Sequence, residues 1–198
     1  RLASAVESWY DLKEFGQHDG FVTIFTDSDD GTLPSGDVVP NVKNTGCEST
    51  YNYGLWCKNT VMWKYWREDA RFKNVKWFVR IMDDSYVHLE NLLDLVKQYN
   101  SSHRIVLGDK HCYWSNHDYP SGGPGVLFSR GTLEDFNMDD WEKPYKAARN
   151  MGSFFDDVAW GDYLYYRKIP VTNHMGIEQA ANRPYSPQYR YWLEFQRG

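Results

Sequence analysis

The stretch VKWFVRIMDDSYV, residues 75–87, combines a predicted strand with a pair of acids. Its first seven residues are rich in β-branched and aromatic side chains, which are typical of a buried strand. Asp83 and Asp84 follow at the point where that strand ends. Paired carboxylates there offer hard oxygen ligands to Mg²⁺ or Mn²⁺, but they also serve as helix caps or solvated turn residues. The two acids alone therefore do not establish a metal site, and other parts of the sequence must be considered with them.

Helical and strand patterns alternate around this stretch. The spacing of apolar residues predicts helices over residues 2–12, 51–69 and 89–96, and strands over 21–25, 75–81 and 104–107. Such alternation predicts an α/β fold with a single, mostly parallel central sheet covered by helices. Ligands then bind beyond the carboxyl ends of the strands, where Asp27 and the two acids fall. A long polar loop, residues 27–41, begins at the same end of the first strand.

The second half of the chain is less regular. It contains a loop through Tyr119, a glycine cluster at residues 122–125, a short helix near 132–136 and a helical stretch over about 157–166. No repeat, linker or low-complexity segment divides the sequence. Residues 1–198 are therefore predicted to form one domain.

Composition excludes several classes of protein. With 41% apolar and 25% charged residues the chain is expected to be globular, and it contains no apolar run near the roughly 18 residues that span a membrane. Its net charge is −5 and its basic residues are scattered, so a nucleic-acid partner is not expected. Aromatic residues make up 17% of the chain, which suits both a thick core and a sugar-binding cleft.

The cysteines indicate an oxidising compartment. Cys47 and Cys57 lie ten residues apart across a polar stretch, as a loop-closing disulfide would, and Cys112 is left over. Asn100 begins a possible N-glycosylation triplet. Both features favour the secretory pathway, and because the sequence starts at Arg1 we expect any targeting segment or anchor to lie outside it.

Residues 77–87 resemble the aspartate-triplet segment of the Fringe-like β-1,3-glycosyltransferases, the group that includes the core 1 galactosyltransferases. Other segments resemble further motifs of that family in the same order. They are residues 1–9 (first helix), 25–27 (second strand), 44–47 with 55–58 (disulfide loop), 121–125 (Gly-Gly-Ala-Gly segment), 156–161 (catalytic acidic segment) and His174 (a histidine near the end of the catalytic core). The resemblance reaches about residue 178 and implies the nucleotide-sugar-binding GT-A fold.

The resemblance implies a metal-dependent, inverting glycosyltransferase. Such an enzyme would move galactose or N-acetylglucosamine from a UDP-sugar to a hydroxyl of a glycan or glycoprotein, forming a β-1,3 linkage. Asp84 is the expected first metal ligand, and Asp83 is a ligand or nucleotide contact. His174 would be a further ligand, since Mn²⁺ accepts imidazole as well as carboxylate, although a surface histidine is the simpler alternative.

Inversion needs one in-line attack, so one carboxylate must take the proton of the acceptor hydroxyl. Asp157 matches the second acid of the family's acidic pair and is the expected general base, with Asp156 as the cap of the next helix. The alternative makes both acids helix caps. Gly122 and Gly123 would let the backbone approach donor or acceptor, or would simply form a tight turn.

The resemblance also implies contacts to the donor, and the neighbouring aromatic residues add candidates for the acceptor site. Contacts to the nucleotide sugar are expected from Arg1, Thr26, Asp27, Asp83, Gly122 and Gly123, and a disulfide from Cys47 and Cys57. Trp114, Tyr119 and Trp160 lie near the glycine and acidic segments in sequence and are expected to stack on acceptor sugars, with core packing as the equal alternative. The resemblance also places the protein in the lumen of the Golgi or endoplasmic reticulum, as a type II membrane protein whose anchor lies outside this chain.

Several positions depart from the family pattern. Met82 replaces the first acid of the triplet, which removes one oxygen and predicts weaker metal binding or none, and Pro124 replaces an alanine and stiffens its loop. Val79 and Leu127 stand where some Fringe proteins carry a second disulfide, and we expect apolar packing instead. The family's first strand is expected before Arg1 and so outside the sequence.

Two alternatives remain open at this point. A non-catalytic sugar- or nucleotide-binding relative would keep the cleft, and Met82 would mark the loss of chemistry. Asp84, Asp157 and His174 together favour the enzyme, because a binding module needs no base opposite a metal site. A metal-dependent phosphohydrolase would fit the acids but not the disulfide loop or the glycine segment.

Overall fold

The computed structural model describes residues 20, 22–27, 41–50, 53–82, 85–112, 117–148, 155–174 and 176–177. Its strands are β1 (Ile24–Thr26), β2 (Val42–Asn44), β3 (Trp77–Arg80), β4 (Val106–Gly108), β5 (Lys110–Cys112), β6 (Asp118–Pro120), β7 (Val126–Ser129) and β8 (Val171–Asn173). Its helices are α3 (Tyr53–Glu68), the 3-10 helix η1 (Ala70–Phe72), α4 (Leu89–Lys97), α5 (Arg130–Glu134), α6 (Met138–Ala148) and α7 (Asp156–Tyr166).

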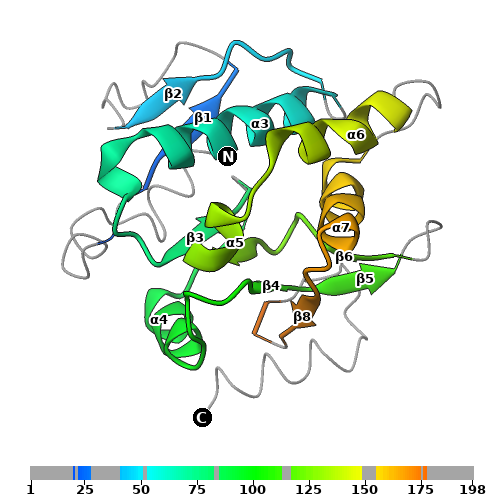
Figure 1. The fold of residues 1–198 in the computed structure, drawn as a ribbon. Coiled ribbons are helices and arrows are strands. Elements are labelled where there is room, and N and C mark those ends of the chain that lie inside the picture. The colour runs from blue at the N-terminus through cyan, green and yellow to red at the C-terminus, as the bar shows by residue number, and fades with distance from the viewer. Residues whose placement is uncertain are drawn as a thin grey trace, which may run out of the picture.

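The central sheet has the strand order β3-β7-β4-β8 (Figure 1). β7 runs antiparallel to both β3 and β4, and only β4 and β8 pair in parallel. The expectation of a mostly parallel sheet is therefore wrong, because no strand was expected at β7 and this strand runs antiparallel to both of its neighbours. Its residues are all buried, so it reads as an apolar run directly after the glycine cluster, without the polar alternation of a half-exposed strand.

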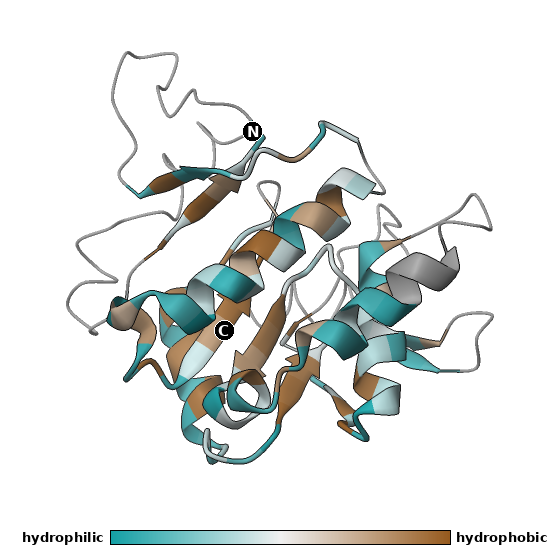
Figure 2. Ribbon diagram, turned by 45° about the horizontal axis from the view of Figure 1, so that its top comes forward, coloured by the Kyte–Doolittle hydropathy of each residue, from teal (hydrophilic) through white to brown (hydrophobic). Residues whose placement is uncertain are grey.

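Helices cover both faces of this sheet (Figure 1). On one face Phe78, Val106 and Phe128 pack against α3, α6 and α7. On the other, Leu107 and Leu127 pack against Leu95 of α4 and the neighbouring apolar residues. Successive side chains of one strand thus enter different cores, as the period of two requires, and the hydrophobic colour in Figure 2 runs along the central strands.

Much of the aromatic content fills the larger core. The Trp63 ring, fully buried, stacks on Phe136 with 4.2 Å between ring centroids, and Trp141 lies 4.4 Å from Trp160. Trp141 also donates its indole N–H to the Thr60 hydroxyl across 2.8 Å. These contacts hold α3, α6 and α7 in one layer, which fixes the amino-terminal end of α7 relative to α3.

Two small sheets accompany the central one. β1 pairs with β2 in parallel, and β5 pairs with β6 in antiparallel. β6 lies tightly against α7 at Gly161, where a Cβ atom would come within 2.5 Å of the Tyr119 Cβ. The absence of a side chain at this helical position therefore allows β6 to lie this close to α7.

Most predicted elements of the described residues are confirmed, with shifted ends. The helices expected over residues 51–69, 89–96 and 157–166 are α3, α4 and α7, and the three expected strands are β1, β3 and β4. The expected helix over residues 2–12 and most of the loop over 27–41 lie outside the described residues. In the described part of the chain, none of the helices is long and apolar enough to cross a membrane.

The predicted disulfide is present. Cys47, which follows β2, is bonded to Cys57 of α3 with an S–S distance of 2.02 Å. The bond ties the end of the small parallel sheet to the first turns of the helix.

Candidate active site

Three segments that are far apart in sequence meet at Arg80. This residue ends β3, and only 7% of its surface is exposed. One guanidinium nitrogen donates to the Asp156 carboxylate at 2.7 Å, and the other donates to the Gly122 carbonyl at 2.9 Å. The end of β3, the glycine segment and the start of α7 are therefore joined by one side chain.

The strand pattern explains why a charged residue is buried here. Phe78 and Arg80 point to the same face of β3, the face that α3 and α7 cover. A buried charge is tolerated when it is paired and hydrogen-bonded. Asp156, itself 8% exposed, supplies the opposite charge at the point where α7 begins. Arg80 was not among the site residues expected from the sequence, although a lone arginine in an apolar strand was a usable signal.

Asp156 does not act as the expected helix cap. The cap position of α7 is Phe155, and no side chain makes a capping hydrogen bond there. The Asp156 carboxylate instead accepts from Arg80 and from the Asn59 side-chain amide, each at 2.7 Å. Asn59 also donates to the Leu55 carbonyl on its own helix. This carboxylate is not available to cap the helix because it is already paired with the buried Arg80 guanidinium. Its contact with Asn59 adds α3 to the site.

The Asp157 carboxylate, the predicted general base, lies against the glycine segment. One oxygen accepts the Val158 N–H at 2.8 Å, which is a helix-terminal contact, and the other accepts the Gly122 N–H at 3.4 Å. Burial, and then the negative charge of Asp156, raise the pKa of the Asp157 carboxyl above its ordinary value. The two backbone N–H groups and Arg80 oppose that rise. A raised pKa suits a group that must accept a proton near neutral pH.

Gly122 is needed for the packing of these charged groups. A Cβ atom at this position would lie 2.7 Å from an Arg80 guanidinium nitrogen and 3.6 Å from the Asp157 Cβ. Gly123 accepts a hydrogen bond of 2.5 Å from the Ser85 hydroxyl, which follows the predicted metal-binding acids in sequence. Gly125 has a φ of +102°, which glycine adopts readily. The structure thus assigns the glycines to close contacts within the protein; contacts to donor or acceptor stay a prediction.

The predicted metal ligands are only partly described. Asp83 and Asp84 lie outside the described residues, and among the described ones no three acidic, histidine or cysteine side chains gather as a metal site. His174 directly follows β8 and is half-buried. The register aligns Arg80 with Val126 and Gly108 with Asn173, so the ends of β3 and β8 lie at the same edge of the sheet. With about 4.8 Å between neighbouring strands, β8 lies about 14 Å from β3.

The contacts of His174 define how it could bind a metal. Its Nδ1 atom accepts the Gly176 N–H at 3.1 Å. A metal bound at Nε2 requires the tautomer with a proton on Nδ1, so His174 would have to release Gly176 on binding. Two carboxylates and an imidazole are a donor set that suits Mn²⁺, and the shared sheet edge is compatible with that set.

Thr26 and Asp27 end β1 and continue from it. The Thr26 carbonyl accepts both the N–H and the hydroxyl of Thr45, which fixes this strand end against the disulfide segment. The Asp27 carboxylate accepts from the Lys58 ammonium at 2.7 Å. That hydrogen bond lowers the pKa of Asp27, so the carboxyl is ionised at neutral pH. Lys58, next to the disulfide in α3, is a charged partner that the sequence analysis did not single out.

The predicted acceptor-stacking aromatics have different outcomes. Trp160 is 1% exposed and packs among Trp63, Phe128 and Trp141, so the prediction that it stacks on a sugar is wrong and the core alternative holds. Its place on α7 turns the ring away from solvent. Tyr119 is half-buried in β6. Trp114 lies outside the described residues, as does Arg1.

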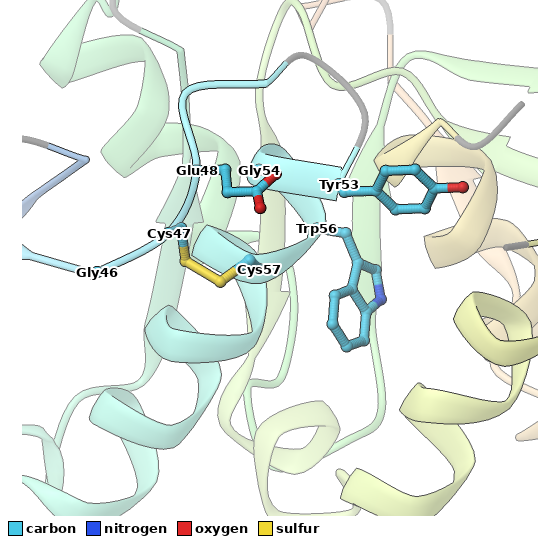
Figure 3. Close-up of a pocket in the computed structure, with 7 residues that line it drawn as sticks. All are labelled: Gly46, Cys47, Glu48, Tyr53, Gly54, Trp56 and Cys57. Atoms are coloured by element: carbon cyan, nitrogen blue, oxygen red, sulfur yellow. A yellow bond between two sulfur atoms is a disulfide. The ribbon is translucent and has the colours of Figure 1, made fainter.

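A pocket of about 520 Å³ opens beside the disulfide (Figure 3). It is lined by Gly46, Cys47, Glu48, Tyr53, Gly54, Trp56 and Cys57. The Trp56 ring is stacked nearly parallel on Trp141, with 6.0 Å between centroids. Asn59, which holds Asp156, follows Trp56 by about one turn of the same helix. The helix α3 therefore contributes residues both to the pocket and to the contacts of Asp156.

The sequence was also compared with known proteins. The model of the family described as Fringe-like matches residues 1–175. Lunatic fringe of Bos taurus, a β-1,3-N-acetylglucosaminyltransferase, is 32% identical over 163 residues, which are 71% of this chain and 38% of that protein. The human lunatic fringe is 31% identical over 161 residues with the same coverage. A β-1,3-glucosyltransferase of Mus musculus is 23% identical over 181 residues, 89% of this chain and 34% of that protein.

The chain spans less than two fifths of the length of these relatives. Arg80, Gly122, Asp157 and His174 all lie within the range that the family model matches. The chain belongs to the Fringe-like family.

Proposed function

We propose that this protein is an inverting glycosyltransferase that moves a hexose or N-acetylhexosamine from a UDP-sugar to a glycan hydroxyl and forms a β-1,3 linkage. The observation that carries the proposal is the Asp157 carboxylate, whose pKa is raised and which is held against Gly122 beside a buried ion pair. A carboxylate in this state takes the acceptor proton as the new bond to the anomeric carbon forms. The relatives are named for β-1,3 transfer, which supports the linkage.

The donor sugar is proposed from two sources. The relatives are named for N-acetylglucosamine and glucose, and the sequence resemblance adds galactose. The leaving group in each case is UDP, whose diphosphate develops charge in the transition state. The GT-A fold and the nucleotide contacts of Thr26 and Asp27 belong to the same proposal.

A divalent cation, Mn²⁺ by preference, is proposed to be held by Asp83, Asp84 and His174. When bound, it would neutralise charge on the diphosphate oxygens. Met82 supplies no oxygen where the family has its first acid, so affinity for the metal should be weaker than with a full triplet. The disulfide supports a place in the secretory pathway, because such bonds persist in oxidising compartments.

The test combines binding with turnover. Calorimetry would measure UDP binding with and without Mn²⁺ for the wild type and for Asp84→Ala, and a second assay would measure UDP release from UDP-galactose, UDP-N-acetylglucosamine and UDP-glucose. Manganese-dependent binding that Asp84→Ala abolishes, together with UDP release from one sugar, is the expected result. Binding without release from any donor would favour the non-catalytic relative, which Met82 makes the second candidate.

A further inference from the structure

We propose that Arg80 is the positioning residue of this site: by holding Asp156 and the Gly122 carbonyl at once, it sets where the Asp157 carboxylate stands relative to the glycine segment. This inference rests on the proposed function for its catalytic consequence. Its geometric content stands on contacts between described residues alone.

The contacts form a closed ring. Arg80 donates to the carbonyl of Gly122, and the N–H of the same glycine donates to Asp157. Asp157 is adjacent to Asp156 in the chain, and Asp156 returns to Arg80 through the 2.7 Å ion pair. Displacing the Arg80 guanidinium would therefore move both the Gly122 peptide and the Asp156 carboxylate, which flank the Asp157 carboxylate.

An arginine suits this position for a geometric reason. Its planar guanidinium presents donors in a fixed fork, so two acceptors can be held at a defined separation. The two acceptors belong to residues 42 and 76 positions away in sequence. A lysine would keep the charge but, as a compact ammonium, would not hold both acceptors in the same geometry.

The ion pair also balances charge around the base. Asp156 from α7 acts on the Asp157 carboxyl with a negative charge, and Arg80 from β3 acts with a positive one. Loss of Arg80 alone would leave the Asp156 charge uncompensated and raise the pKa of Asp157 further. Loss of the Asp156 charge alone would lower it. The two single changes should thus move one property in opposite directions, which a general loosening of the structure would not do.

The experiment uses Arg80→Gln, Arg80→Lys, Asp156→Asn and the double variant Arg80→Gln/Asp156→Asn. For Arg80→Gln, kcat for UDP release should fall by about 10²-fold, the size of effect that a 1 Å misplacement produces. The acid limb of its pH profile should move to higher pH, and that of Asp156→Asn to lower pH. Arg80→Lys should keep the acid limb near that of the wild type, because the charge is kept, and recover only part of kcat.

The chain offers a matched control at the other end of α7. Arg167 is a partly buried arginine that pairs with Asp135 and Asp140 at 2.8 and 3.0 Å. It follows the helix, about 16 Å along the axis from Asp156. Arg167→Gln should lower the melting temperature but leave kcat and the acid limb unchanged. If Arg80→Gln alone does not fold, the double variant Arg80→Gln/Asp156→Asn can be measured in its place. Removing both buried charges costs less stability than leaving one of them unpaired.

A second readout does not depend on activity. The amide resonance of Gly122 in a ¹⁵N-labelled sample should titrate with Asp157, because its N–H donates to that carboxylate. Its midpoint should rise in Arg80→Gln and fall in Asp156→Asn. A protein that releases no UDP but shows these shifts would refute the proposed function and keep the positioning role. The positioning role would be overturned if the Gly122 titration midpoints were unchanged in these variants. It would also be overturned if Arg167→Gln lost as much kcat as Arg80→Gln.

Discussion

Gly122 donates its backbone N–H to the Asp157 carboxylate across 3.4 Å, while the carbonyl of the same glycine accepts from Arg80 at 2.9 Å. The first distance is at the long end for a hydrogen bond, so the carboxylate is oriented without being fully engaged. A group held in this way can still accept a proton from a substrate hydroxyl. The glycine peptide is thus the link between the buried arginine and the proposed base.

Gly122→Ala should damage the site and the fold together. The added Cβ would lie 2.7 Å from the Arg80 guanidinium, which must then move away from Asp156 or from the glycine carbonyl. Overpacking of this kind costs about 1–3 kcal/mol. Measured on the same preparation, the melting temperature and the rate of UDP release should both be lower than in the wild type.

A core variant provides the control for that substitution. Ile169 is 3% exposed and follows α7 at the end away from the site, and Ile169→Val should cost about 1 kcal/mol without lowering turnover. Normal kcat in Gly122→Ala would show that the close contact with Arg80 is dispensable.

Asp157→Asn should raise the stability of the protein at neutral pH. Because burial raises the pKa of Asp157 in the folded state above 3.8, the folded protein binds this proton more tightly than the unfolded chain. Stability is therefore lost as pH rises through the raised pKa, and the asparagine variant escapes that loss. Melting temperatures measured from pH 7 downward should show a gain for the variant that shrinks as the pH approaches the ordinary range of an aspartate. A variant less stable than the wild type at pH 7 would show that the ionised Asp157 carboxylate does not destabilise the folded protein.

Reduction of the Cys47–Cys57 disulfide should destabilise the fold. The bond closes a loop with a sequence separation of 10, for which the chain-entropy model gives about 2–3 kcal/mol. Thermal unfolding with and without dithiothreitol, and of Cys47→Ser/Cys57→Ser, would measure the loss. Cys112→Ser, which changes an exposed third cysteine, should unfold like the wild type. An equal melting temperature with and without reductant would rule out a stabilising role for the bond.

Cysteines placed at Val79 and Leu127 should form a second disulfide. The two residues are register partners on β3 and β7, and both belong to the core that faces α4. In a Cys112→Ser background, Val79→Cys/Leu127→Cys should oxidise and gain about 2–4 kcal/mol relative to its reduced form. Alkylation followed by mass spectrometry detects the bond.

The register makes a sharp control possible. Phe128 is one residue further along β7 and packs in the opposite core, so Val79→Cys/Phe128→Cys should keep both thiols alkylatable. Oxidation of this second pair, and not of the first, would show that the strands pair one residue out of step.

The sequence predicted the local elements better than the sheet. The strand around Phe78 and the helix at Asp157 were found because their apolar patterns are local. The position and direction of β7 were not found from the sequence. Strand pairing depends on contacts between residues as distant as Arg80 and Val126. A fully buried strand also lacks the alternation of polar and apolar residues that would mark it.

The site was predicted in its parts but not in its connections. Asp157 and the glycine segment were identified by resemblance, whereas Asp156 was assigned to a cap because its partners lie on β3 and α3. Trp160 was placed at the acceptor because it is near Asp157 in sequence, but its position on α7 directs it into the core. Side-chain partners across elements depend on the tertiary fold, which a motif does not contain.

If Asp157 is the general base, the turnover of Asp157→Asn must show it. UDP release from the most active UDP-sugar would be measured beside UDP binding by calorimetry. We expect kcat to fall by about 10²- to 10⁴-fold, the usual contribution of a general base, while UDP binds as in the wild type. Turnover close to that of the wild type, with binding intact, would show that another group takes the proton and that the assignment is wrong.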